Sequence, residues 1–462
     1  MQRQVQATQI IARMLQMSTV CFMLFFSSAC AHYAIDDAPL SQWTPKRDSA
    51  LENMGAADRS SKLLVLVAFS GGGTRAASFA YGVLQELAGT EVMTANGSLP
   101  LIKEIDIISS VSGGSFTSAY YGLYGDRIFE DYEEQFLRQD VQSELLWKVA
   151  RPINWFRIAS PAYGKADMAA EHYDKILFNG ATFADMNRPD VPVVVINTTD
   201  LATGLRFPFD KPFFDVLCLD LDQYSISRAV TASSAVPGLF STITLKNHAG
   251  SCGYEQPAWL TEAIMDENST NRKLLANTIE GYLEPKNRPW LFLVDGGVSD
   301  NLGLRAFYDL FDLAGDMEYA LKMINHADVR QILIVSVDSH TNPKKEWTFK
   351  RANPSLRQVL GSVSSVQIGR YSIDTMEIVR NAYGKWTEEL NDAGHPISFH
   401  FVEVSFAGVK NDADRERLHE IGTNFGLSDE EVDLLISSAR QALRGSSAFQ
   451  DFLVENRQLP RP

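Results

Sequence analysis

The chain has 462 residues, of which 45% are hydrophobic, 21% charged and 10% aromatic; this excludes a disordered, collagen-like or disulfide-scaffold protein. The formal net charge is −15, from 57 acidic and 42 basic residues. Because a nucleic-acid partner needs a basic face, this balance argues against nucleic-acid binding.

Residues 1–30 are expected to form a secretory signal. Arg3 and Arg13 precede a moderately long apolar run that ends in small residues, as signal peptides do. Polar residues interrupt the run, so it is too short for a membrane anchor. Ala29-Cys30-Ala31 fits an A-x-A cleavage site, whereas the serines before Cys30 resemble a bacterial lipobox. We expect export, either as a periplasmic or secreted protein or as a lipoprotein anchored through Cys30, with residues 31–60 as a flexible linker.

Short apolar runs alternate with helix-like stretches along most of the chain. Nearly continuous apolar strands are typical of a parallel sheet that helices cover on both faces. We therefore expect a three-layer α/β domain with a mainly parallel central sheet over residues 61–340. The expected strands cover residues 62–69, 105–111, 191–197, 290–294, 332–337 and 397–404.

A helix-rich C-terminal extension is expected over residues 341–462. The apolar residues from Leu356 to Tyr383 recur with helical spacing and predict one or two amphipathic helices. Ser428 and Glu431 form a capping box that predicts the start of another helix. Nothing in this part of the sequence indicates a catalytic residue.

Gly71, Gly72 and Gly73 connect the first expected strand to a helix-like stretch, and Arg75 follows them. Successive backbone N–H groups at a helix start can bind an anion. The spacing Gly71-x-Gly73-x-x-Ala76 also fits a dinucleotide fingerprint, but the next strand ends without the acidic residue that this site requires. No Gly-Lys-Ser/Thr follows, so the sequence does not match a Walker A loop either. The third use of such a loop is an oxyanion hole.

Ser112 lies where the second expected strand runs into a helix-like stretch. Small residues surround it in Ser110-Val111-Ser112-Gly113-Gly114. This pattern resembles the nucleophile elbow G-x-S-x-G, with Ser110 in place of the first glycine. The pattern predicts that the Ser112 hydroxyl is presented at the edge of the sheet.

A serine nucleophile needs a base, and the sequence leaves two kinds of candidate. Asp295 ends the strand at 290–294 and is followed by Gly296 and Gly297, which places a carboxylate at an edge where α/β sheets carry their sites. Asp-Gly-Gly is also a common turn. Among the histidines, His340 is the best candidate because it follows a strand, so the residues alone leave the base open.

Five motifs in order resemble the patatin-like phospholipase family. They cover about residues 62–338, and the motifs SGGGTR, SVSGGS and DGG each follow an expected strand. The motifs are SGGGTR at 70–75, SVSGGS at 110–115, NTTDLATG at 197–204, TASSAVPG at 231–238 and DGG at 295–297.

The resemblance implies a lipid acyl hydrolase with a Ser-Asp dyad and no cofactor or metal. Ser112 would be the nucleophile and Asp295 the base. Gly71 to Gly73 with Gly113 would form the oxyanion hole, Arg75 would support it, and Gly114, Gly296 and Gly297 would shape the site. The substrate would be a membrane lipid or another lipid ester. Two alternatives are an inactive surface lipoprotein, with Ser110 impairing the elbow, and a nucleotide- or phosphate-binding protein that uses Gly71 to Gly73.

Two further features remain open. Cys218 and Cys252 would face an oxidising compartment after export and could form a disulfide or remain as two buried thiols. The apolar and aromatic stretch from Trp147 to Ile158 contains three basic residues. It is compatible with a lipid-facing surface, but we expect an ordinary core helix.

Overall fold

The computed structural model describes residues 37–45, 59–94, 97–158, 160, 163–267, 269–342, 346–349 and 351–458. The expected signal at 1–30, its candidate anchor Cys30 and most of the expected linker lie outside these ranges. Within the described ranges, no helix combines the length and apolar composition that a bilayer crossing requires.

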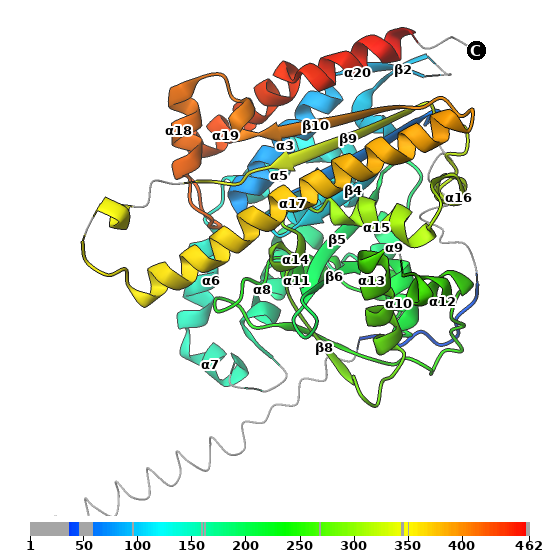
Figure 1. The fold of residues 1–462 in the computed structure, drawn as a ribbon. Coiled ribbons are helices and arrows are strands. Elements are labelled where there is room, and N and C mark those ends of the chain that lie inside the picture. The colour runs from blue at the N-terminus through cyan, green and yellow to red at the C-terminus, as the bar shows by residue number, and fades with distance from the viewer. Residues whose placement is uncertain are drawn as a thin grey trace, which may run out of the picture.

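An eight-stranded sheet forms the centre of the molecule (Figure 1). Its strand order is β10-β9-β1-β4-β5-β8-β7, with β6 paired to β5. The strands from β10 to β5 are parallel, whereas β6, β7 and β8 are antiparallel to their neighbours. The bounds are β1 Leu63–Phe69, β4 Ile105–Val111, β5 Val193–Asp200, β6 Leu205–Phe209, β7 Ile243–Lys246, β8 Trp290–Asp295, β9 Gln331–Asp338 and β10 Ser398–Ser405; β2 Glu91–Thr94 and β3 Gly97–Pro100 form a separate hairpin.

Helices cover both faces of this sheet, which confirms the predicted α/β fold with its mainly parallel sheet. The side chains of β1 alternate between two cores because successive side chains of a strand point to opposite faces. Val65 and Val67 belong to a core shared with α3, α4 and α19, whereas Leu64 and Leu66 belong to one shared with α15 and α17. All seven residues of β1 are therefore buried, which explains the continuous apolar sequence.

The helices of these layers differ widely in length. In chain order they are α3 Thr74–Ala88, α4 Gly113–Tyr124, α5 Ile128–Tyr132, α6 Val141–Ala150, α7 Pro152–Ile158, α8 Lys165–Tyr173, α9 Phe183–Met186, α10 Lys211–Val216, α11 Ile226–Ser233, α12 Ala258–Met265, α13 Thr270–Tyr282, α14 Gly297–Asp300, α15 Arg305–Ala314, α16 Met317–Met323, α17 Leu356–Asp392, α18 Asp412–Glu420, α19 Asp429–Gly445 and α20 Ser447–Gln458.

The C-terminal segment, expected as a helix-rich extension from residue 341, contributes a strand to the central sheet. Strand β10 pairs with β9 along its whole length and completes the central sheet. Helix α19 begins at the predicted capping box of Ser428 and Glu431. It packs so closely on α3 that a Cβ at Gly82 would lie 2.5 Å from the Ile436 carbonyl oxygen. The periodic stretch after residue 355 forms one long helix, α17.

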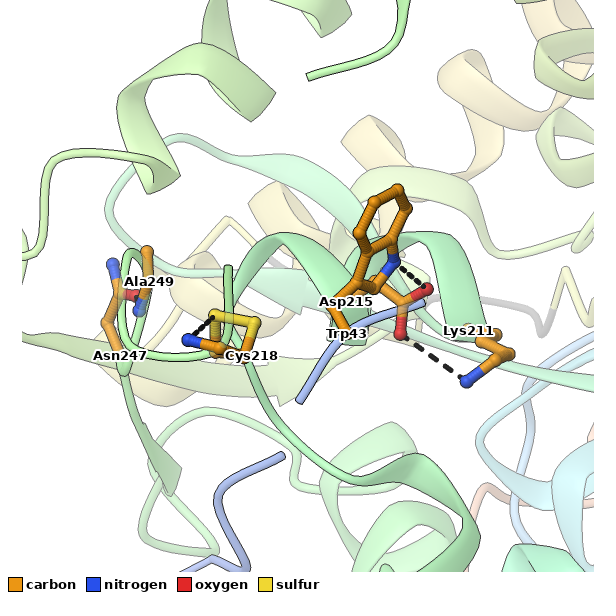
Figure 2. The surroundings of a disulfide bond; sticks show 7 residues. Trp43, Lys211, Asp215, Cys218, Asn247 and Ala249 are labelled. Atoms are coloured by element: carbon orange, nitrogen blue, oxygen red, sulfur yellow. Dashed lines mark hydrogen bonds and ion pairs between the residues drawn. A yellow bond between two sulfur atoms is a disulfide. The ribbon is translucent and has the colours of Figure 1, made fainter. Parts of the chain in front are cut away.

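The structure joins Cys218 and Cys252 by a disulfide bond (Figure 2). Residues 37–45, which were expected to belong to a flexible linker, pack beside it. The N–H of Trp43 donates to the Cys252 carbonyl oxygen at 2.8 Å, and its indole Nε1 donates to Asp215 at 3.0 Å. This part of the expected linker is therefore held against the folded domain.

The expectation of a core helix between Trp147 and Ile158 is wrong. The stretch forms the end of α6 and the whole of α7, and no residue of α7 is buried. Arg151 is the C-cap of α6, and Pro152 begins α7 directly after it. The chain changes direction between the two helices, and α7 lies at the edge of the molecule (Figure 1).

Candidate active site

The sheet brings the end of β4 and the end of β8 together. Strand β6 pairs with both Asn197 and Thr198 along one edge of β5. On the other edge, Asn197 is opposite Val111, the last residue of β4, and Thr198 is opposite Asp295, the last residue of β8. The two strands therefore approach each other end to end along β5. Ser112, which follows Val111, lies next to Asp295 for this reason.

Ser112 has the backbone conformation of a nucleophile elbow, with φ of 49° and ψ of −120°. Residues with a side chain rarely adopt positive φ, and a sharp strand-to-helix turn imposes it here. Helix α4 begins at the next residue, Gly113. A Cβ at Gly113 would lie 2.0 Å from the Gly73 carbonyl oxygen, and one at Gly114 would lie 2.7 Å from Phe69 Cβ. Both glycines thus allow the elbow to pack against the end of β1 and the glycine loop.

Ser110 does not require the conformational freedom of glycine. It is a regular member of β4, paired with Phe69 and Ile196. Its buried hydroxyl accepts a hydrogen bond from Ser118 at 2.6 Å. The strand therefore accommodates a serine at this position, and Ser118 of α4 donates a hydrogen bond to its hydroxyl.

Asp295 is buried, and its carboxylate accepts a hydrogen bond from the Gly297 N–H at 2.8 Å. Burial raises the pKa of Asp295 to about 6, although this hydrogen bond and the neighbouring Ser112 hydroxyl lower it. Such a carboxyl group can accept and return a proton near neutral pH.

A hydrogen-bond network fixes both sides of this pair. The Ser233 hydroxyl accepts from the Ser112 N–H at 2.8 Å and donates to the Asn197 carbonyl oxygen at 2.6 Å. The Ser233 carbonyl oxygen accepts from the Gly296 N–H at 3.1 Å. Gly296 itself lies so close to β5 that a Cβ would be 2.4 Å from the Asn197 oxygen. Ser233 therefore connects the elbow to the turn that carries Asp295.

The side chain of Asn197 continues the network to a buried ion pair. Its amide donates to the Ser110 carbonyl oxygen at 3.0 Å and accepts from Arg206 at 2.8 Å. Arg206 in turn donates two hydrogen bonds to Asp309. In the sequence, Asn197 and Ser233 are recognisable only as members of the motifs at 197–204 and 231–238. Their roles depend on contacts between strands that no local pattern reveals.

The backbone N–H groups of the glycine loop are not equivalent. The N–H of Gly71 donates to the Asn301 carbonyl oxygen at 3.0 Å, so it is occupied and the prediction of Gly71 as an oxyanion donor needs correction. Among the described residues, the N–H groups of Gly72, Gly73 and Gly113 have no hydrogen-bond partner. These three groups are the available donors at the start of α3 and α4.

Asn301 is a site residue that sequence analysis missed. A Cβ at Gly71 would lie 2.6 Å from its Oδ1 atom and 3.2 Å from Ser112 Cβ. A Cβ at Gly297 would lie 2.7 Å from the same Oδ1 atom. The Asn301 amide thus fills the space between the glycine loop and the Asp295 turn. Its position six residues after Asp295 is the only sequence signal.

The Arg75 side chain forms hydrogen bonds to backbone carbonyl oxygens of distant segments. Its guanidinium donates to the carbonyl oxygens of Ser339 at 2.9 Å and Ile421 at 2.8 Å. Burial lowers its pKa to about 10. A Cβ at Gly72 would lie 2.9 Å from its Nη2 atom. Arg75 therefore connects the glycine loop to the C-terminal segment.

The start of α3 is covered by that same segment. The N–H of Thr74 donates to the Asn424 carbonyl oxygen at 2.9 Å, and a Cβ at Gly73 would lie 2.3 Å from this oxygen. The Thr74 N–H is therefore not available to an anion at this helix start.

The contacts of the candidate bases differ. Asp295 lies beside the Ser112 hydroxyl, whereas the N–H of His340 donates to Asp338 at 2.9 Å and its ring lies beside Gly369. Within the described residues, no three His, Cys, Asp or Glu side chains are grouped so that they could hold a metal ion. The arrangement places a serine with positive φ beside a buried aspartate where two strands of an α/β sheet meet.

The family comparison agrees with this class of site. The family model described as patatin-like phospholipase matches residues 67–308. This range is more than half of the chain and contains both Ser112 and Asp295. The chain belongs to the patatin-like phospholipase family, as its five motifs predicted.

Solved structures of human GIVD cytosolic phospholipase A2 are also similar. One has a TM-score of 0.43 and 12% sequence identity, over 89% of this chain and 65% of that chain. Another, in complex with methyl gamma-linolenyl fluorophosphonate inhibitor and terbium chloride, has a TM-score of 0.41 and 13% identity, over 92% of this chain and 66% of that chain. The chain spans slightly less than two thirds of their length. No curated protein sequence matched it.

Proposed function

We propose that the protein hydrolyses carboxylic esters of lipids with Ser112 as the nucleophile and Asp295 as the base. Membership of the patatin-like phospholipase family supports a lipid ester as substrate. The observation that carries the proposal is that Ser112, held at positive φ at the end of β4, lies next to the buried Asp295 at the end of β8.

In the first half of the reaction, Asp295 accepts the Ser112 hydroxyl proton while the oxygen attacks the ester carbonyl carbon. The N–H groups of Gly72, Gly73 and Gly113 donate to the oxyanion that forms. A single donor of this kind typically contributes about 2.7 to 4 kcal/mol to transition-state stabilisation. Asp295 then returns its proton to the alcohol that leaves, and the acyl group stays on Ser112.

In the second half, a water molecule releases the acyl group. Asp295 accepts a proton from this water, whose oxygen attacks the acyl carbon. The tetrahedral intermediate uses the same N–H donors and collapses to a carboxylic acid and free Ser112, to which Asp295 returns the proton. The cycle consumes one water and leaves the protein unchanged.

Hydrolysis of a short-chain p-nitrophenyl ester tests this proposal. Ser112→Ala and Asp295→Asn should each abolish turnover while circular dichroism shows a folded protein. Ser118→Ala is a matched control, because Ser118 is a buried serine of α4 that bonds to Ser110 and makes no contact with Asp295. Turnover that survives both Ser112→Ala and Asp295→Asn would refute the assignment. No turnover by the parent protein on short-chain esters or phospholipid vesicles would favour the inactive alternative.

A further inference from the structure

The hairpin of α6 and α7 exposes large apolar side chains that a soluble domain usually buries. The exposed fractions of the side chains are 71% for Trp147, 69% for Ile153, 61% for Leu146, 59% for Trp155 and 46% for Phe156. All five lie within eleven consecutive residues. Five large apolar side chains exposed within so short a segment indicate an interaction site.

The hairpin holds these side chains outward through its own hydrogen bonds. The Trp155 indole donates to the Val149 carbonyl oxygen at 2.9 Å, and the Asn154 amide donates to the Lys148 carbonyl oxygen at 2.7 Å. These bonds tie α7 to the last turn of α6. Arg157 anchors the other end through an ion pair with Glu171 of α8. The exposed face is therefore preformed.

The charge of the hairpin identifies the kind of partner. Residues 146–158 contain Lys148, Arg151 and Arg157 and no acidic residue. The one acidic residue of the hairpin, Glu144, lies in the first turn of α6, 3.2 Å from His172. Lys148 contacts His172 and Arg157 pairs with Glu171, whereas Arg151 is exposed in the turn between the helices. Tryptophan combined with cationic side chains is the composition that collects at the interface of an anionic bilayer.

The hairpin is also connected to the candidate active site. The N–H of Gln142, in the first turn of α6, donates to the Phe425 carbonyl oxygen at 3.0 Å, and the Phe425 N–H donates to the Gln142 side chain. The preceding residue, Asn424, contacts Gly73 and Thr74 of the glycine loop. In Figure 1 the hairpin lies on the side toward which the arrowheads of β9 and β10 point.

We propose that residues 146–156 of the α6–α7 hairpin form a docking surface for an anionic phospholipid bilayer, with Trp147 and Trp155 inserted at the interface and Arg151 facing the lipid headgroups. This surface would bring the glycine loop close to the lipid. Docking is measured without turnover, so its outcome is separate from that of the proposed hydrolysis.

Quenching of tryptophan fluorescence by brominated acyl chains tests the proposal on the full chain carrying Ser112→Ala. In vesicles of phosphatidylcholine and phosphatidylglycerol, the brominated lipid should quench the emission. Trp147→Phe/Trp155→Phe should lose most of this quenching. Trp290→Phe is the control, because Trp290 is also an exposed tryptophan, with an exposed fraction of 47%, but lies in β8, and this variant should retain the quenching. Arg151→Glu should require several-fold more anionic lipid.

Two results would overturn the proposal. The first is that brominated lipid does not quench the tryptophan emission, or quenches it equally in the Ser112→Ala protein with and without Trp147→Phe/Trp155→Phe. The hairpin would then stay outside the bilayer. The other is a dimer in sedimentation velocity that Trp147→Ser/Ile153→Ser converts to a monomer, since the face would then bind a second copy of the chain.

Discussion

The surroundings of Asp295 have two opposite effects on the pKa of its carboxyl group. Burial disfavours its charged form, whereas the neighbouring Ser112 hydroxyl and the hydrogen bond from the Gly297 N–H favour it. Burial is the larger effect, and the pKa rises from an ordinary value near 4 to about 6. The aspartate thus remains mostly ionised at neutral pH but is a stronger base than an exposed carboxylate.

This environment predicts the pH dependence of ester hydrolysis. Only ionised Asp295 can accept the Ser112 proton, so kcat/KM should rise with pH, pass through an apparent pKa near 6 and then reach a plateau. Below that pKa the rate should fall about tenfold per pH unit. A pH–rate profile with a soluble ester measures this. A profile without ionisation between pH 4 and 8 would exclude Asp295 as the base.

Gly113 should tolerate no side chain. In Gly113→Ala the new Cβ would meet the Gly73 carbonyl oxygen at 2.0 Å, and a backbone atom cannot move without displacing the glycine loop. We expect a loss of about 1 to 3 kcal/mol of unfolding free energy together with loss of turnover. Gly384→Ala in α17 is the control, because nothing lies within 4 Å of its Cβ position. Equal urea denaturation midpoints and equal activity for the two variants would contradict this packing.

The sequence predicted the catalytic candidates better than their surroundings. Ser112 and Asp295 stand out because strand-to-turn motifs carry them. The hydrogen bond that occupies the Gly71 N–H and the amide of Asn301 could not be predicted, because both depend on how the turn after β8 packs against the end of β1.

At the scale of elements, the antiparallel direction of β8 is the decisive feature of the sheet. An apolar run at residues 290–294 does not reveal strand direction, and sequence analysis placed Asp295 at the carboxyl edge of a parallel sheet. The structure also extends β5 through Thr198 to Asp200, beyond the expected end at Asn197. Polar residues continue this strand because β6 and β8 supply their backbone partners.

The disulfide between Cys218 and Cys252 should stabilise the part of the domain that contacts residues 37–45. It links residues 34 positions apart, for which chain entropy predicts about 3 to 4 kcal/mol of unfolding free energy. Cys218→Ser/Cys252→Ser should therefore lower the Tm and the denaturation midpoint. Calorimetry with and without reductant checks this. If reductant lowers the Tm of the double variant as much as that of the parent, the assignment fails.

At the scale of the whole molecule, the chain forms one α/β unit in which the C-terminal part reaches the candidate site. The strand at 397–404 and the capping box at Ser428 were both predicted. They were expected to belong to a helix-rich extension, because the sequence pattern becomes helical after about residue 340. The contacts of Arg75 with Ile421 and of Thr74 with Asn424 join this extension to the glycine loop. Pairing between distant segments leaves no local pattern in the sequence.

The central claim is that Asp295 activates Ser112 as the nucleophile. The most direct measurement is labelling with a fluorophosphonate at pH 7.5, followed by peptide mass spectrometry of the parent and of Asp295→Asn. A single adduct on Ser112 in the parent, lost in Asp295→Asn while the protein stays folded, is the predicted result. An adduct on another serine, or equal labelling of Ser112 in both proteins, would contradict the account.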